Sequence, residues 1–207
     1  MNSRKMHRAT RKQPKQDRSK VTVEAILDGA IRVFDRMGAE SSTTAHIAEA
    51  AGVSVGTLYQ YFSNRDAVVD ALQDREFDRA LAMLVKHLGA ESLTDARALA
   101  RAVVSGLLDL YRAAPGLHRL LAIDGLHVTP TERVQAFDRR VVEMLRAFFD
   151  ATHFHIRRNN RHAAAFVLYQ SVRATLLAAI LEEPAGLSDE ILINELTDLV
   201  AGHLLGE

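Results

Sequence analysis

The 207-residue sequence contains no cysteine. Disulfide bonds and thiolate metal sites are therefore excluded, and nothing in the composition points to an oxidising compartment. The basic N-terminal residues lack the apolar run of a secretory signal peptide. We therefore expect a cytoplasmic protein, and a chain of this length can bury a substantial core without covalent staples.

A long uninterrupted apolar run is also missing. The most apolar stretch, residues 163–181, is broken by Gln170, Ser171, Arg173 and Thr175, which favours a buried helix over a membrane span. Its apolar residues lie nearly all round a helix, so it must be covered on more than one side. We expect one side to face the chain's own core. The other side, with the final helix beside it, is expected to face a second copy in a four-helix dimer bundle, with Ala178 and Leu196 as candidate interface positions.

Catalytic and metal-binding patterns are absent as well. No nucleophile accompanies a base and an oxyanion site, and no glycine-rich loop could cradle a phosphate, so neither an enzyme nor a cofactor is predicted. The triplet of His153, Phe154 and His155 places its two histidines about 200° apart on a helix, because each residue advances about 100°. These histidines cannot share an ion without further ligands, and no metal site is predicted.

Alternating strand-like runs are absent, and helical spacing of apolar residues recurs along the chain. Capping residues and glycine or proline stops divide these stretches. The sequence therefore predicts an all-α fold of about nine helices, at residues 23–37, 47–51, 54–62, 63–88, 94–114, 115–123, 129–148, 160–181 and 188–204.

Charge is balanced overall but unevenly distributed. Residues 1–20 hold eight lysines and arginines against Asp17 alone, which gives +7 and leaves −7 for the rest of the chain. A basic arm on an acidic body is typical of nucleic-acid binding, although a solvated tail that keeps the protein soluble has the same composition.

The stretch TTAHIAEAAGVSVGTLYQYF, residues 43–62, predicts a helix-turn-helix. Gly52 supplies the turn and Ala48 a close helix contact, while the apolar side chains on both helices face inward. The second helix of such a unit enters the major groove, where small residues allow close approach and hydroxyl and amide groups reach phosphates and base edges. The outward residues are Val55, Gly56, Thr57, Gln60 and Tyr61, with Tyr59 near the edge between groove and core.

This stretch, continued by SNRDAVVDAL, resembles the DNA-binding segment of the TetR (tetracycline-repressor) family of bacterial transcriptional regulators. The shared pattern is a threonine before the first motif helix, then I-A-x-x-A-G-V-S, G-T-L-Y-x-[HY]-F and a basic residue after a short polar turn. The resemblance covers roughly residues 18 to 80, and the later helices fit the family's ligand-binding and dimerisation body in number and order. It implies a homodimer, a palindromic operator in double-stranded DNA, and release of that DNA when a small molecule binds.

The resemblance also implies roles for individual residues. Thr44 would contact a phosphate at a helix N-terminus, and Tyr59 and Tyr61 align with the family's contact aromatics. Arg65 stands where the family usually has a lysine, and arginine can grip a phosphate as well. The full set of predicted DNA-contacting residues is Thr44, Ser54, Val55, Gly56, Thr57, Tyr59, Gln60, Tyr61 and Arg65.

The middle helices carry more apolar residues than one packing face requires, so they predict either a plain packed core or a cavity for an effector. A mainly apolar lining with a few polar points suits a small apolar or aromatic molecule, with an anionic or hydroxyl group where the polar points lie. The predicted ligand-binding residues are Leu107, Leu108, Tyr111, Leu121, Phe137, Val141, Phe166, Tyr169, Gln170 and Arg173.

The sequence thus predicts a basic arm (residues 1–17), a DNA-binding domain (18–80) and a ligand-binding and dimerisation domain (81–207). The predicted function is a ligand-responsive DNA-binding repressor. The competing hypothesis is a helical small-molecule-binding or enzymatic protein whose N-terminal unit is only structural. A groove helix rich in small and hydrogen-bonding residues, together with the basic arm, argues for the repressor.

Overall fold

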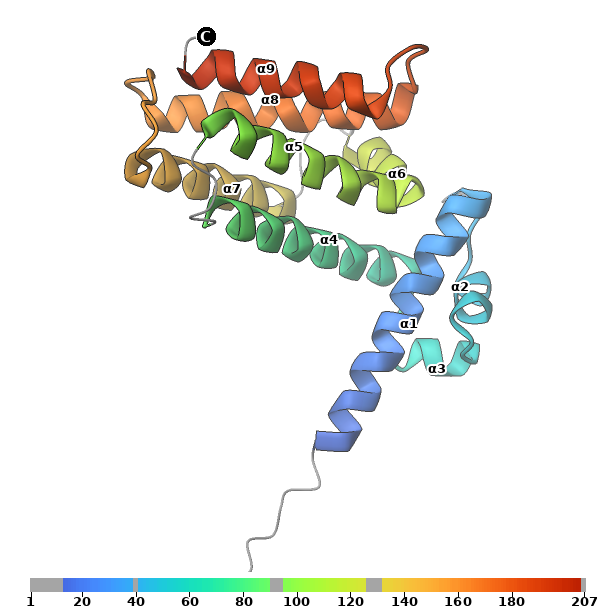
Figure 1. The fold of residues 1–207 in the computed structure, drawn as a ribbon. Coiled ribbons are helices and arrows are strands. Elements are labelled where there is room, and N and C mark those ends of the chain that lie inside the picture. The colour runs from blue at the N-terminus through green and yellow to red at the C-terminus, as the bar shows by residue number, and fades with distance from the viewer. Residues whose placement is uncertain (1–12, 39–40, 90–94, 126–131, 206–207) are drawn as a thin grey trace, which may run out of the picture. The chain divides into compact units, whose positions relative to one another are not determined.

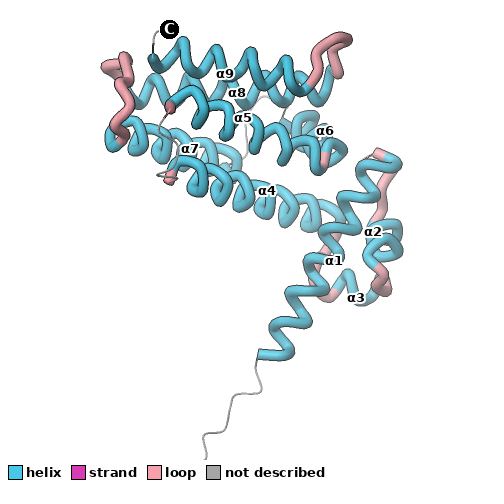
Figure 2. Tube along the Cα trace, viewed as in Figure 1, coloured by secondary structure: helices cyan, strands magenta, loops and turns pink. Residues whose placement is uncertain are grey.

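A computed structural model describes residues 13–38, 41–89, 95–125 and 132–205 of the chain. These residues form helices and no strand, as predicted (Figures 1 and 2). The nine helices of the described ranges are α1 (Gln13–Met37), α2 (Thr44–Ala51), α3 (Val55–Tyr59), α4 (Arg65–Leu88), α5 (Ala96–Ala113), α6 (Pro115–Gly125), α7 (Glu132–Ala151), α8 (Arg161–Glu182) and α9 (Asp189–Leu205).

The chain divides into two compact units, Met1–Leu72 and Gln73–Glu207. The division falls inside α4, as does the predicted boundary between residues 80 and 81. The assignment of DNA binding to the first unit and of ligand binding to the second stays a prediction.

The first unit is built around α1, which packs along α2, while α2 packs on α3. Its core consists of aliphatic and aromatic side chains spaced three or four residues apart on α1 and drawn from each of the following helices. The most deeply buried are Ile26, Ala30, Phe34, Ile47, Leu58, Val68 and Leu72.

The second unit is centred on α8, which contacts α5, α6, α7 and α9 (Figure 1). Buried residues of α8 recur along its whole length, from Ala164 to Ile180, so the helix lies within the core of the unit. By length and composition alone, α8 is also the one helix in the described ranges that could cross a bilayer. The core helix of a soluble protein meets the same criterion.

Charged side chains join α5 to α9 across the surface of the second unit. Arg101 Nη2 donates to Glu190 Oε1 at 2.8 Å, and Arg112 Nη2 donates to Asp189 Oδ1 at 2.7 Å. A third pair joins Arg97 and Asp198. Single exposed ion pairs stabilise little, so these pairs supplement the direct packing of α5 on α9.

Several predicted helix ends are wrong. The first helix begins at Gln13, ten residues before the expected Val23, so part of the predicted flexible arm is helical. The third helix ends at Tyr59 rather than Phe62, and Asn64 instead of Ser63 caps α4, its Oδ1 accepting from the Ala67 amide at 2.8 Å. The predicted start at Thr129 lies outside the described residues.

Candidate nucleic-acid interface and effector site

The turn between α2 and α3 has the geometry of a helix-turn-helix. Gly52 adopts a left-handed conformation (φ 69°), which a glycine takes at no steric cost. The amides of Gly52 and Val53 close α2 through hydrogen bonds of 3.0 Å to the carbonyls of Glu49 and Ala48. Ser54 then caps α3 by accepting from the Thr57 amide at 3.0 Å. The sequence therefore fixes both the end of α2 and the start of α3.

Most of the residues predicted to face outward in and after α3 are exposed. Val55, Gly56, Tyr59, Gln60 and Tyr61 are exposed, while the intervening Leu58 and Phe62 are buried. Thr57 is half-buried, and its hydroxyl lies 2.8 Å from that of Ser54. The Ser54 hydroxyl is thus engaged in capping α3, which is a structural role whether or not DNA is present.

Tyr59 is 52% exposed, which makes it a surface residue rather than a member of the core. Its hydroxyl lies 3.1 Å from the hydroxyl of Thr44, the first residue of α2. Two of the predicted phosphate contacts, one on each motif helix, therefore lie at a single position on the surface of the unit.

Arg65 does not project outward as expected. Its side chain is only 28% exposed, its Nε donates to the hydroxyl of the buried Ser42 at 3.0 Å, and its guanidinium lies 5.6 Å from the centre of the Phe34 ring. This arginine therefore joins α4 to α1 and to the segment that precedes α2. Its predicted phosphate contact stays a prediction, but the residue also has a structural role that the sequence did not reveal.

Two residues that sequence reasoning missed set the packing of α1 on α2. Arg32 Nη2 donates to the Ala50 carbonyl at 2.6 Å, near the C-terminal end of α2. A Cβ atom placed on Gly29 would lie 2.8 Å from the backbone nitrogen of Ala51, so the helices touch at backbone distance there. An isolated glycine inside a helical pattern was the available signal, since such a residue usually has a packing reason.

Most of the basic arm lies outside the described residues, so its predicted DNA contacts are not located. The next two basic residues after the arm, Arg18 and Lys20, are exposed on α1.

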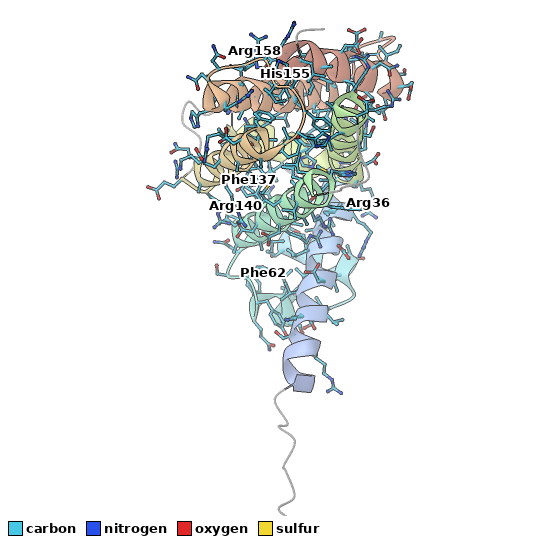
Figure 3. All side chains as sticks on the ribbon, turned by 60° about the vertical axis from the view of Figure 1, so that its left-hand side comes forward. Arg36, Phe62, Phe137, Arg140, His155 and Arg158 are labelled. Carbon is cyan, nitrogen blue, oxygen red and sulfur yellow. The ribbon has the colours of Figure 1, made fainter. Side chains whose placement is uncertain are left out.

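The predicted effector residues lie in the second unit, and most of them come together. Leu108 and Val141 belong to the buried core, and Leu107, Tyr111, Phe137 and Tyr169 pack against it. Phe137 of α7, labelled in Figure 3, stacks on Phe77 of α4 with ring centres 4.0 Å apart. Leu121, Gln170 and Arg173 are partly buried.

The prediction that Phe166 lines the effector cavity is wrong, because this side chain is 51% exposed and cannot line an interior cavity of a single chain. It lies beside the exposed Val167 on α8, and α9 likewise exposes Ile191 and Leu199. Leu196, expected at a subunit interface, is instead buried in the chain's own core. Helices α8 and α9 therefore each bury one apolar face and expose part of another.

Polar groups from four helices of the second unit lie among these apolar residues. The Tyr169 hydroxyl (α8) donates to Asp138 Oδ1 (α7) at 2.5 Å, and the ring of Tyr111 (α5) stacks on that of His118 (α6) with centres 4.3 Å apart. Burial raises the pKa of Tyr111, an effect that Arg173 opposes and Asp138 reinforces. Burial also lowers the pKa of His118 to about 4, so this imidazole is neutral at pH 7. Sequence reasoning missed Asp138 and His118, because a lone polar residue on a helix gives no sign of what it faces.

Other titratable groups give no further site. His153 and His155 are exposed in the connector between α7 and α8, where Arg158 Nε donates to the His203 carbonyl at 2.5 Å (Figure 3). Across the described ranges, no three His, Asp or Glu side chains are grouped so that they could hold a metal ion. A hollow of about 260 Å³ lies between α5 and α9, and its lining, which includes Asp95, Arg101 and Asn194, has no predicted ligand residue.

An all-helical chain with a helix-turn-helix in its first unit and a separately packed second unit has the organisation of a two-domain bacterial regulator. The sequence profile described as "Bacterial regulatory proteins, tetR family" matches residues 26–72, and the profile "Tetracyclin repressor-like, C-terminal domain" matches residues 95–204. The second match covers more than half of the chain, so the protein belongs to the tetR family.

Individual relatives match only part of the chain, at modest sequence identity. The chain is 31% identical over 96 residues to the HTH-type transcriptional regulator BetI of Stenotrophomonas maltophilia, a match that covers 46% of this chain and 48% of that protein. It is 35% identical over 77 residues to the HTH-type transcriptional repressor ComR of Escherichia coli, covering 37% of each chain. The chain thus matches about half or less of the length of these relatives.

Among solved structures, the fold resembles that of the fatty acid degradation regulator FadR of Bacillus halodurans. The TM-score is 0.67 at 19% identity, over 86% of this chain and 94% of the other. At this level of identity the similarity supports the fold alone.

Proposed function

We propose that the protein is a DNA-binding transcriptional repressor of the cytoplasm that acts as a homodimer and leaves its operator when a small organic effector binds. The exposed face of α3 carries this proposal. Gly56 and Tyr59 of α3 and Gln60 directly after it are exposed, and Thr57 is half-buried, so small and hydrogen-bonding residues cover the buried Leu58. Such a face can enter a major groove and place donors and acceptors against base edges and phosphates.

The joined hydroxyls of Thr44 and Tyr59 support a phosphate contact. Thr44 lies at the N-terminus of α2, where unpaired backbone amides and the helix dipole favour an anion. A phosphate oxygen can accept from one of the two hydroxyls, so the pair acts as one contact that α2 and α3 hold in place.

The proposal is tested by measuring binding of the purified protein to DNA from upstream of its own gene, against unrelated DNA of equal length. Tyr59→Ala is expected to weaken binding by about 1–3 kcal/mol, the range for losing a well-placed hydrogen bond to a charged group. Tyr59→Phe, which removes only the hydroxyl, is expected to account for most of that loss. Arg139→Ala, at an exposed position on α7, is the matched control. Equal binding to both DNAs, or unchanged affinity in both Tyr59 variants, would contradict the proposed interface.

The exposed apolar side chains of α8 and α9 support the homodimer. Phe166 and Val167 on α8 and Ile191 and Leu199 on α9 are exposed on helices that contact each other. A monomer that exposes large apolar side chains on neighbouring helices has a surface suited to a second copy. A two-fold dimer of this kind would bind half-sites about one helical turn apart, or a multiple of it.

A further inference from the structure

The polar cluster inside the second unit has unused hydrogen-bonding capacity. We define this cluster as Tyr111 of α5, His118 of α6, Asp138 of α7, and Tyr169 and Arg173 of α8. Asp138 is engaged, because the Tyr169 hydroxyl donates to it at 2.5 Å. The other three members do not satisfy one another.

His118 is the clearest case, since it is 8% exposed and its Nε2 atom has no hydrogen-bond partner. In the neutral tautomer that carries its proton on Nδ1, Nε2 is an acceptor. A buried acceptor without a donor lowers the stability of the folded state. Buried polar groups are normally paired, and the stacked ring of Tyr111 holds this one in its orientation.

Arg173 and Tyr111 provide unused donors close by. The one hydrogen bond described for Arg173 runs from Nη1 to the neutral amide oxygen of Gln170, at 3.3 Å. A partly buried guanidinium with no carboxylate partner retains most of its donors and its full charge. The Tyr111 hydroxyl makes no hydrogen bond within the described residues, and it lies close enough to Arg173 for that charge to influence it.

We propose that this cluster binds the polar end of a small aromatic acid that carries a hydroxyl group. The carboxylate pairs with the guanidinium of Arg173 and accepts from the Tyr111 hydroxyl, while the hydroxyl of the ligand donates to Nε2 of His118. The ring lies among the apolar side chains that surround the cluster, among them Leu107, Leu108 and Phe137.

The proposed acid site depends on the proposed function in one respect, which is that the acid would be the effector that releases the DNA. Binding is measured calorimetrically on the full chain with 2-, 3- and 4-hydroxybenzoate and 4-hydroxyphenylacetate. Each acid is paired with its methyl ester, and benzoate is the acid without a hydroxyl. At least one hydroxylated acid is expected to bind roughly 10- to 100-fold more tightly than its ester, the range for a charge-assisted contact.

Substitutions at Arg173 and His118 test separately the recognition of the carboxylate and of the hydroxyl group of the ligand. Arg173→Gln is expected to abolish the preference for the acid, and Arg173→Lys to restore part of it. His118→Phe keeps a ring against Tyr111 and is expected to remove the preference for the hydroxylated acid over benzoate. Arg139→Gln, on the exposed side of α7, should change neither, and thermal melting verifies that each variant is folded.

The proposal is overturned if no acid of the panel binds more tightly than its ester, or if Arg173→Gln keeps the preference while folded. Operator binding is measured separately, with and without the bound acid. Acid binding without any DNA binding would contradict the proposed function and leave the site intact. DNA binding without acid binding would contradict the proposed acid site and leave the proposed function intact.

Discussion

At the scale of single residues, Arg65 has a structural role besides its predicted phosphate contact, and its sequence position did not reveal the structural role. The stability role depends on Ser42, 23 residues earlier, and on the ring of Phe34. Arg65→Ala is expected to lower the free energy of unfolding by about 1–2 kcal/mol, because a hydrogen bond to a buried hydroxyl and a cation–π contact are lost. Urea titration of the purified variant measures this loss.

Arg65→Lys is the control that separates the predicted phosphate contact from the effect on stability. Lysine keeps the charge but cannot reproduce the Nε contact, so it should restore DNA affinity more fully than stability. Equal stability of the Ala variant and the wild type would show that the contact with Ser42 contributes nothing.

His118 gives the second residue-scale prediction, a loss of stability in acid. Its folded pKa of about 4 lies below the ordinary value of 6.5, so between these values the unfolded chain binds more protons and stability falls as pH falls. The free energy of unfolding should drop by about 2 kcal/mol between pH 7.5 and pH 5 on account of this residue.

The drop is measured by urea titration at both pH values, in the wild type and in His118→Phe. Only the difference between the two proteins counts, because burial also lowers the pKa of His203. A drop of the same size in His118→Phe would contradict the assignment.

At the scale of helices, Gly29 shows how the backbone of α1 approaches that of α2. In a free helix, replacing glycine by alanine stabilises by about 1 kcal/mol. Here the added Cβ would lie 2.8 Å from Ala51 N and 3.0 Å from Ala51 Cα, which are backbone atoms that cannot turn aside. Gly29→Ala is therefore expected to destabilise the first unit by about 1–3 kcal/mol, the cost of overpacking.

Gly56→Ala is the matched control. Its added Cβ would meet only Ser54 Oγ, at 3.8 Å, an ordinary contact. That variant should be as stable as the wild type or more so, as measured by thermal melting. A gain of stability in Gly29→Ala would show that α1 and α2 can move apart without cost.

The sequence predicted helices best where a cap and an apolar face coincide. Ser54 caps α3 and Asn160 caps α8 at the predicted starts of these helices, and Asp95 caps α5 within one residue of the predicted start. The first turns of α1, read as QPKQDRSK, were missed because they have no apolar face for periodicity to detect. Phe166 and Leu196 were placed on the wrong sides of α8 and α9, since an apolar pattern that runs nearly all round a helix does not show which side faces inward.

At the scale of the whole molecule, the exposed apolar residues of α8 and α9 predict a dimer that one charge can disrupt. Phe166→Glu is expected to raise the dimer dissociation constant about 30-fold or more, the effect of losing one important interface residue. Because the side chain is half exposed, the fold should survive. Sedimentation at several concentrations measures the change, and operator affinity should fall with it.

Val85→Glu places the same charge at an equally exposed apolar position on α4 and should leave the dimer intact. Leu196→Glu should unfold the second unit instead of dissociating it, since that residue is 2% exposed. A wild-type protein that sediments as a monomer at micromolar concentration would contradict the dimer.

The ion pairs between α5 and α9 also bear on the order in which the protein folds during synthesis. Arg97 and Asp198 are 101 residues apart, whereas Arg65 and Ser42 are 23 residues apart and Thr44 and Tyr59 are 15. At about 5–20 residues per second, α5 leaves the ribosome roughly 5 to 20 seconds before the matching part of α9. Short-range contacts form without this delay, so the unit with the helix-turn-helix can fold early, and the surface that would pair two copies forms only after α9 has emerged.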